Sequence, residues 1–210
     1  MKNIIILFTV IIILNSCQEA EKISIGFPEP ENPEPLAAGL WDKVQPGLHI
    51  SYGSVDERYN RDSPPEINNN DSWNGVGWKG EKIHTQFLLW AEQDITNMTW
   101  HVSNLTDSKG NTINSQKIEI RAIRYVLTDE FLTGCGWRDK DTIQAHLVGD
   151  ILEPVEQLNL PAQSVRPMWL SINIPKDQEP GLYNGKLNIN YDPEASLSLN
   201  ISILIQALWN

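Results

Sequence analysis

Apolar residues alternate with polar ones along three stretches in the C-terminal part of the chain. The stretches cover residues 168–174, 187–191 and 197–205. A period of two residues is the signature of a half-buried β-strand. Pro180 and Gly181 lie between the first two stretches and predict a turn, because proline fixes φ and glycine permits positive φ.

Three successive strands, each with one apolar face, need a second layer that covers this face. We therefore predict an all-β fold, an Ig-like antiparallel β-sandwich organised around a C-terminal meander. In residues 118–127 the apolar positions change parity, which predicts a β-bulge near Arg121 and Ala122, because a bulge adds one residue to a strand. The same alternation predicts earlier or shorter strands at residues 48–52, 83–90, 95–105 and 151–160.

The N-terminus has the form of a targeting segment. Lys2 precedes an apolar run, residues 4–14, that is too short to span a bilayer. Residues 14–17, Leu-Asn-Ser-Cys, resemble a bacterial lipobox, in which the leader is cut before the cysteine and the cysteine is lipidated. We expect residues 1–16 to be a lipoprotein signal peptide and Cys17 to carry the lipid. The alternative is an ordinary secretory leader with a chance cysteine.

The residues after Cys17 extend this expectation. Residues 18–21 form an acidic cluster that resembles the surface-export signal of Bacteroidetes lipoproteins, so we expect an outer-membrane lipoprotein that faces the cell surface or the periplasm. Proline and glutamate recur up to residue 35. Such segments stay extended and bury no core, so we assign residues 17–35 to the lipidated cysteine and a tether. Residues 36–210 then form the β-sandwich domain.

Charge and cysteine content narrow the class of partner. The 210 residues carry a formal net charge of −11, which argues against a nucleic-acid partner, because phosphate binding needs a basic surface. The two cysteines, Cys17 and Cys135, give neither a disulfide framework nor a Cys/His metal spacing. The sequence has no Gly-rich phosphate loop. We expect no cofactor and no metal.

Two regions contain candidate functional residues. Residues 58–76 show no apolar period and predict a long loop, in which Trp73 either stacks on a sugar or pins the loop to the sandwich. Asp129 and Glu130 are adjacent carboxylates of the kind that performs glycoside hydrolysis when they flank the scissile bond. Adjacent residues of a strand point to opposite sides, so a solvated turn is the other interpretation. Cys135, between two glycines, is either a nucleophile or a packed thiol.

Three stretches together resemble a known family. They are residues 80–90, residues 124–130 followed by Gly-Cys-Gly at 134–136, and residues 165–185 with Arg-Pro-Met-Trp-Leu and Pro-Gly-x-Tyr-x-Gly. In this order and spacing, the chain resembles the N-terminal domain of glycoside hydrolase family 123 over about residues 36–206. The resemblance implies a β-sandwich that precedes a TIM barrel in β-N-acetylgalactosaminidases.

The resemblance also bears on catalysis. Members of this family use substrate assistance, in which the acetamido group of the substrate attacks the anomeric carbon and a neighbouring acid protonates the leaving oxygen. The catalytic Asp-Glu pair belongs to the barrel. Asp129 and Glu130 lie in the sandwich part and do not match that pair, so we carry no catalytic role over to them.

These observations give one main hypothesis and two alternatives. In the main one, the chain is a non-catalytic domain that supports or docks a glycosidase barrel, with Trp137, Trp209 and the loops of residues 58–76 and 128–149 at the contact. These side chains could instead fold back onto the sandwich. The first alternative is a surface glycan-binding lipoprotein that uses Trp73 or Trp137. The second is an active hydrolase that uses Asp129 and Glu130.

Overall fold

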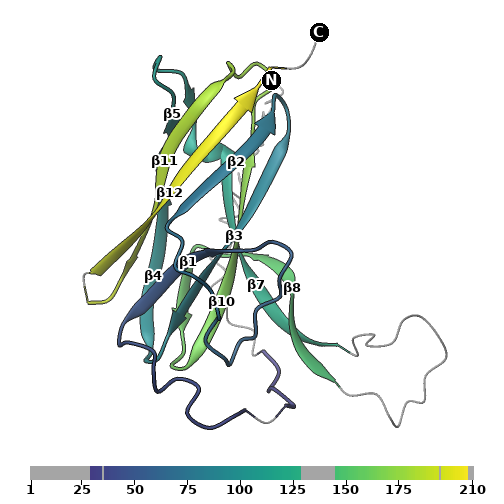
Figure 1. Cartoon of the computed structure of the whole chain (residues 1–210), viewed down its shortest axis with the longest axis vertical. Coiled ribbons are helices and arrows are strands. Elements are labelled where there is room, and N and C mark those ends of the chain that lie inside the picture. The colour runs from purple at the N-terminus through teal and green to yellow at the C-terminus, as the bar shows by residue number, and fades with distance from the viewer. Residues whose placement is uncertain (1–28, 35, 129–144, 194, 208–210) are drawn as a thin grey trace, which may run out of the picture.

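The structure, a computed structural model, describes residues 29–34, 36–128, 145–193 and 195–207. In these ranges the chain forms two β-sheets that pack face to face (Figure 1). One short 3-10 helix, η1 (Ser115–Lys117), lies directly before the strand that begins at Ile118. The predicted all-β sandwich is confirmed.

Sheet A has five strands, and all of its neighbouring strands are antiparallel. Their order across the sheet is β1 (Leu48–Gly53), β3 (Lys82–Ala91), β10 (Ser164–Asn173), β7 (Ile118–Thr128) and β8 (His146–Pro154). Figure 1 shows β7 and β8 leaving the body of the sandwich side by side.

Sheet B carries the remaining strands. Their order is β2 (Ser72–Trp78), β12 (Ala195–Gln206), β11 (Gly181–Tyr191), β4 (Ile95–Val102) and β9 (Gln157–Leu160), while β5 (Leu105–Thr106) pairs with β11 and with β6 (Thr112–Ile113). The β2–β12 pair is parallel and the others are antiparallel. The single short strand predicted at residues 151–160 is instead the end of β8 and all of β9, which belong to different sheets.

The predicted C-terminal meander is wrong in one respect. β11 and β12 form a long hairpin, but β10 lies in the other sheet, between β3 and β7. Met168 and Leu170 of β10 are buried on its inner face, and Val165 and Pro167 are buried on its outer face. Burial on both faces is typical of a strand in the centre of a sheet. Because β10 belongs to sheet A and β11 to sheet B, the connection after Ile174 crosses from one sheet to the other.

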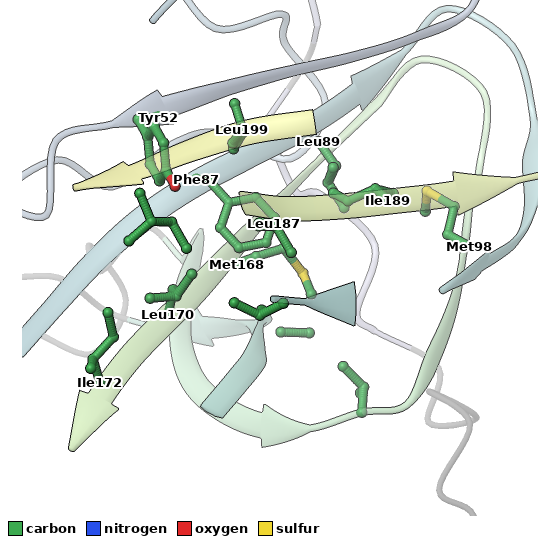
Figure 2. Close-up of a cluster of buried hydrophobic side chains, with 14 of the residues drawn as sticks. Tyr52, Phe87, Leu89, Met98, Met168, Leu170, Ile172, Leu187, Ile189 and Leu199 are labelled. Atoms are coloured by element: carbon green, nitrogen blue, oxygen red, sulfur yellow. The ribbon is translucent and has the colours of Figure 1, made fainter. Parts of the chain in front are cut away.

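The main core fills the space between the two sheets. Alternate residues of β3 and β10 meet alternate residues of β11 and β12 there, as expected for packed antiparallel sheets. Figure 2 shows this cluster, and its labelled side chains are Tyr52, Phe87, Leu89, Met98, Met168, Leu170, Ile172, Leu187, Ile189 and Leu199.

The region of residues 58–76 is not a loop throughout, because β2 begins at Ser72. In β2, Gly75 and Gly77 occupy inward-facing positions at which a strand normally has apolar side chains. A Cβ at Gly75 would lie 2.8 Å from Ile203 Cδ1, and one at Gly77 would lie 2.5 Å from Ile174 Cδ1. Glycine therefore lets the β2 backbone approach the core closely. The strand is hidden from sequence periodicity for the same reason.

The bulge predicted near Arg121 and Ala122 is wrong. The β7–β10 and β7–β8 registers run unbroken through both residues. The parity change is real but has another cause, because Ile123 and Tyr125 are buried on the outer face of sheet A while Ala122 is buried on the inner face. The register shift occurs later, where Arg124 and Tyr125 of β7 lie opposite residues 151 and 149 of β8.

A second apolar cluster covers one end of the outer face of sheet A. Trp41, Leu88, Trp90 and Val165 form it. Val44, which precedes β1, and Tyr59 and Ile67, which lie between β1 and β2, pack around them. Trp41 Nε1 donates a hydrogen bond to the carbonyl of Asp62 at 3.1 Å, which ties this layer together. Within the described ranges, no helix has the length and apolar character needed to cross a membrane.

The two faces of β11 give a direct test of this packing. Leu187 is fully buried between the sheets, whereas Leu182 on the same strand is 51% exposed on the outer face. We expect Leu187→Ala to lower the free energy of unfolding by about 2–5 kcal/mol, because it leaves a cavity. Leu182→Ala should change it by no more than about 0.5 kcal/mol. Urea denaturation of both variants measures the difference, and equal losses would contradict the assigned faces.

Candidate functional site

Trp73 lies in β2 rather than in a loop. Its side chain is half-buried and packs against the main core, and its ring centroid lies 6.5 Å from that of Tyr52, with the planes tilted by 44°. The ring therefore anchors β2 to the sandwich. This packing leaves much less of its face for a sugar than an exposed loop position would.

The other sequence-predicted site residues lie outside the described ranges. They are Cys17, Asp129, Glu130, Cys135, Trp137 and Trp209.

A cluster of buried charged side chains lies in sheet A where the ladder between β7 and β10 has ended. Arg166 of β10 donates from Nη1 to Glu29 Oε1 at 2.5 Å and from Nη2 to Glu29 Oε2 at 2.9 Å. The side chains of Arg166 and Glu29 are only 7% and 10% exposed. Two parallel hydrogen bonds between a guanidinium and a carboxylate form one of the stronger polar contacts in proteins.

The position of this ion pair follows from the end of a strand ladder. β7 and β10 pair up to Ala122 and Met168, and the next residue of β10 is Pro167, which has no N–H. Beyond that point, Arg166 Nη1 donates to the carbonyl of Ile123 at 2.9 Å, and the N–H of Tyr125 donates to Glu29 Oε1 at 2.9 Å. The two side chains thus satisfy backbone groups of β7 that a strand would otherwise satisfy.

Residues 29–34, which we call the N-terminal strap, lie against the sandwich. Arg61 Nη1 donates to the carbonyl of Pro30 at 2.9 Å, and Asn32 Nδ2 donates to Asp62 Oδ2 at 2.9 Å. Glu34 Oε1 lies 2.5 Å from His146 Nδ1 at the start of β8. The tether predicted from composition is therefore not free of the domain over these residues.

The strap borders a cleft of about 540 Å³. Glu29, Arg61, Asp62 and Arg166 line it together with residues 157–159 and 161–164. The charged groups on the strap side already bond to each other, since Arg61 Nε also donates to Asp62 Oδ1 at 2.7 Å. The charges that line the cleft are therefore largely neutralised within the protein.

Electrostatics fix the protonation of this cluster. Burial by itself would raise the pKa of Glu29, but the hydrogen bonds and positive charge of Arg166, with the Tyr125 N–H, outweigh it and hold the pKa below its ordinary value of 4.5. Burial raises the pKa of Tyr125, whose hydroxyl donates to the carbonyl of Tyr59 at 2.9 Å. Glu29 is therefore ionised and saturated with donors at neutral pH, which suits a structural role rather than acid–base catalysis.

Metal binding finds no support in the part of the chain that the structure describes. No three His, Cys, Asp or Glu side chains gather there in a way that could hold an ion.

An exposed apolar row crosses the outer face of sheet B. Leu182 of β11 lies opposite Leu204 of β12, and Leu204 lies opposite Val76 of β2. These three side chains, which we call the aliphatic row, are 51%, 41% and 55% exposed. The next cross-strand row along the same face is polar, with Asn184 opposite Ser202.

Comparison with known proteins identifies the family. A sequence profile described as the glycoside hydrolase 123 N-terminal domain matches residues 52–191, which is most of the sandwich. The chain belongs to the glycoside hydrolase 123 N-terminal domain family. The resemblance inferred from residues 80–90, 124–136 and 165–185 is thereby confirmed.

A solved structure agrees with this fold. A family 123 glycoside hydrolase from Clostridium perfringens, described in a study of glycolipid glycan hydrolysis, superposes with a TM-score of 0.66 and 24% identity over 77% of this chain. The match covers 27% of the Clostridium chain, so our family 123 domain spans about a quarter of that enzyme. A PapD-like domain of human CEP192 matches with a TM-score of 0.40 and 12% identity, over 86% of this chain and 99% of that domain. None of the curated proteins matches significantly.

Sequence reasoning missed the Glu29–Arg166 pair in this family 123 domain. The two residues are 137 positions apart, and Glu29 sits in a Pro/Glu-rich segment whose composition is typical of a tether. Two local signals were present. Arg166 is a charged residue at the start of a strongly apolar strand, and Pro167 next to it interrupts the backbone donors of that strand.

The ion pair predicts a pH-dependent contribution to stability. The folded-state pKa of Glu29 lies below its unfolded value, so the stabilisation is present in full above about pH 4.5 and is lost as the pH falls through the folded-state pKa. We expect Glu29→Gln to lower the free energy of unfolding by about 3 kcal/mol at neutral pH, because it leaves Arg166 buried without a counter-charge. The deficit should shrink on acidification.

Denaturant titrations at several pH values measure this deficit. Glu31→Gln is the matched control, because Glu31 lies two residues away on the same strap and is exposed. It should leave stability unchanged throughout. A Glu29→Gln deficit that stays constant down to about pH 2 would contradict the assignment.

Proposed function

We propose that this chain is a non-catalytic domain that supports or docks a glycosidase catalytic domain in glycan degradation. The observation that carries the proposal is family membership. The matching profile covers the sandwich, while the solved Clostridium enzyme is far longer than the part this chain covers. The chemistry of Glu29 agrees with this role, because this largely buried carboxylate is already saturated by Arg166 and a backbone donor.

The aliphatic row is the docking surface that we favour. Cross-strand neighbours lie about 5 Å apart, so Leu182, Leu204 and Val76 form one continuous strip on a largely polar face. Apolar strips rimmed by polar residues tend to mark partner sites. The strip also lies two residues before Gln206, where β12 ends, so a domain that follows the sandwich in sequence would emerge beside it. Trp137 and Trp209 remain predicted contributors.

The two alternatives lead to different results. A surface glycan-binding lipoprotein would bind glycans without needing a catalytic partner. An active hydrolase would turn over a chromogenic β-N-acetylgalactosaminide as the purified chain, and Asp129→Asn or Glu130→Gln would abolish the turnover. In the role that we favour, the purified chain shows no turnover.

Docking gives the test of the main proposal. Isothermal titration calorimetry of the full chain with a family 123 catalytic barrel measures their affinity. We expect association, and we expect the double variant Leu182→Ser and Leu204→Ser to weaken it at least about tenfold, which corresponds to about 1.4 kcal/mol. Lys186→Ser is the matched control, because Lys186 is exposed four residues beyond Leu182 on the outer face of β11. Association that is indifferent to the row, or no association, would remove this docking surface.

We also propose that the domain is anchored to a membrane through a lipid on Cys17. The support is the lipobox-like Leu-Asn-Ser-Cys behind a short apolar run. If the strap stays docked, only residues 18–28 separate the lipid from the sandwich, a reach of at most about 40 Å. Detergent partitioning of wild type and Cys17→Ala tests this. Wild type should enter the detergent phase and the variant should not, and identical partitioning would rule out the anchor.

A further inference from the structure

A second cleft, of about 250 Å³, opens on the outer face of sheet A away from the strap. Neither the ion pair nor the aliphatic row belongs to it. Its polar lining comes from three separate segments, and Trp169 supplies an aromatic surface. The residues that matter below are Glu57, Arg58, Gln86, Gly149, Asp150 and Trp169.

Trp169 is fixed at the centre of the sheet. It lies on β10, opposite Gln86 of β3 on one side and Arg121 of β7 on the other. Its indole is half-buried, and the His84 ring lies 5.6 Å away at a tilt of 34°. A half-buried ring on a central strand is held rigidly and still reaches the surface, so it can serve as a platform without losing conformational freedom on binding.

Asp150 reaches the cleft because of the β-bulge. The register passes from Arg124 opposite Ile151 to Tyr125 opposite Gly149, so Asp150 is the extra residue of β8 and has no cross-strand partner. Bulges commonly re-aim a side chain in this way. A Cβ at Gly149 would lie 2.9 Å from Ile123 Cγ2, so glycine keeps the floor of the cleft clear.

The opposite rim of the cleft is tied to the sheet. Gln86 is buried, and its Nε2 donates to the carbonyl of Ser54 at 2.7 Å and to that of Glu57 at 3.2 Å. The N–H of Ser54 donates in turn to the Tyr59 hydroxyl at 2.9 Å. These bonds hold Glu57 and Arg58 beside Asp150 and Trp169. The cleft is therefore largely formed before any ligand arrives.

We propose that this cleft binds one pyranose unit of a neutral glycan. The face of an indole carries partial negative charge and attracts the C–H groups on the apolar face of a sugar ring. Asp150 and Glu57 offer carboxylate oxygens that accept hydrogen bonds from sugar hydroxyls. The volume is just below the range typical of drug-sized ligands, which matches a single sugar ring.

Charge decides between neutral and anionic sugars. Two carboxylates against one guanidinium line the cleft, and the whole chain carries a net charge of −11. The negative charge would repel a sulfated, phosphorylated or uronic-acid unit, whereas the carboxylates would accept hydrogen bonds from the hydroxyls of a neutral sugar. This site is independent of the docking surface, which lies on the outer face of the other sheet, so either proposal can fail without the other.

Titrations of the full chain with the methyl glycosides of glucose, galactose, mannose and N-acetylgalactosamine test the site. Tryptophan fluorescence and sugar-proton saturation transfer report the binding. We expect saturable millimolar binding of at least one of these sugars. Trp169→Ala should weaken it about tenfold or more, because the stacking surface is lost. Asp150→Asn should weaken it less and leave thermal stability unchanged, since Asp150 is exposed.

The matched control is Trp78→Ala, because Trp78 is also a half-buried indole but lies in sheet B. It should bind the sugar like wild type. If Trp169→Ala fails to fold, Asp150→Asn decides alone. The proposal is overturned if none of the four sugars binds at tens of millimolar, if binding ignores both cleft substitutions, or if glucuronate or a sulfated sugar binds more tightly than the neutral ones.

Discussion

The burial of β3 and β10 on both faces is the constraint on which the rest of the structure depends. These two strands share a ladder from Asn173 opposite Lys82 to Ser164 opposite Ala91, and their inner side chains build the main core. Their outer side chains, such as Leu88 and Val165, are buried as well, so a sandwich of two sheets cannot satisfy them alone. A third, irregular layer from the N-terminal part of the chain covers them.

The N-terminal strap is bonded to that layer through Arg61 and Asp62. Burying Arg166 beside an apolar cluster would be costly without a counter-charge, and Glu29 supplies it. The same carboxylate takes the N–H of Tyr125, where the β10 ladder has ended at Pro167. Glu29, from a segment with the composition of a linker, thus neutralises the charge of Arg166 and satisfies the backbone N–H of Tyr125.

The two outer faces of the sandwich differ in consequence. The outer face of sheet A is covered at the end near Trp90 and Val165 and hollowed around Trp169, where the bulge places Asp150. The outer face of sheet B has no such layer among the described residues and presents the aliphatic row instead. In this member of the glycoside hydrolase 123 N-terminal domain family, the two proposed sites, for a sugar and for a partner domain, therefore lie on opposite faces.

The sequence by itself determined the strands, because alternation in residues 168–174, 187–191 and 197–205 reports directly which faces are buried, and it also carried the family motifs. Which sheet each strand joins, the strand hidden behind Gly75 and Gly77, and the bulge at Asp150 were decided only by the tertiary structure. Sheet membership and register depend on partners far away in the chain. The pairing of Glu29 with Arg166 and the meeting of Trp169 with Asp150 and Glu57 arise in the same way. Local patterns record burial, whereas these sites depend on which distant segments the packing brings together.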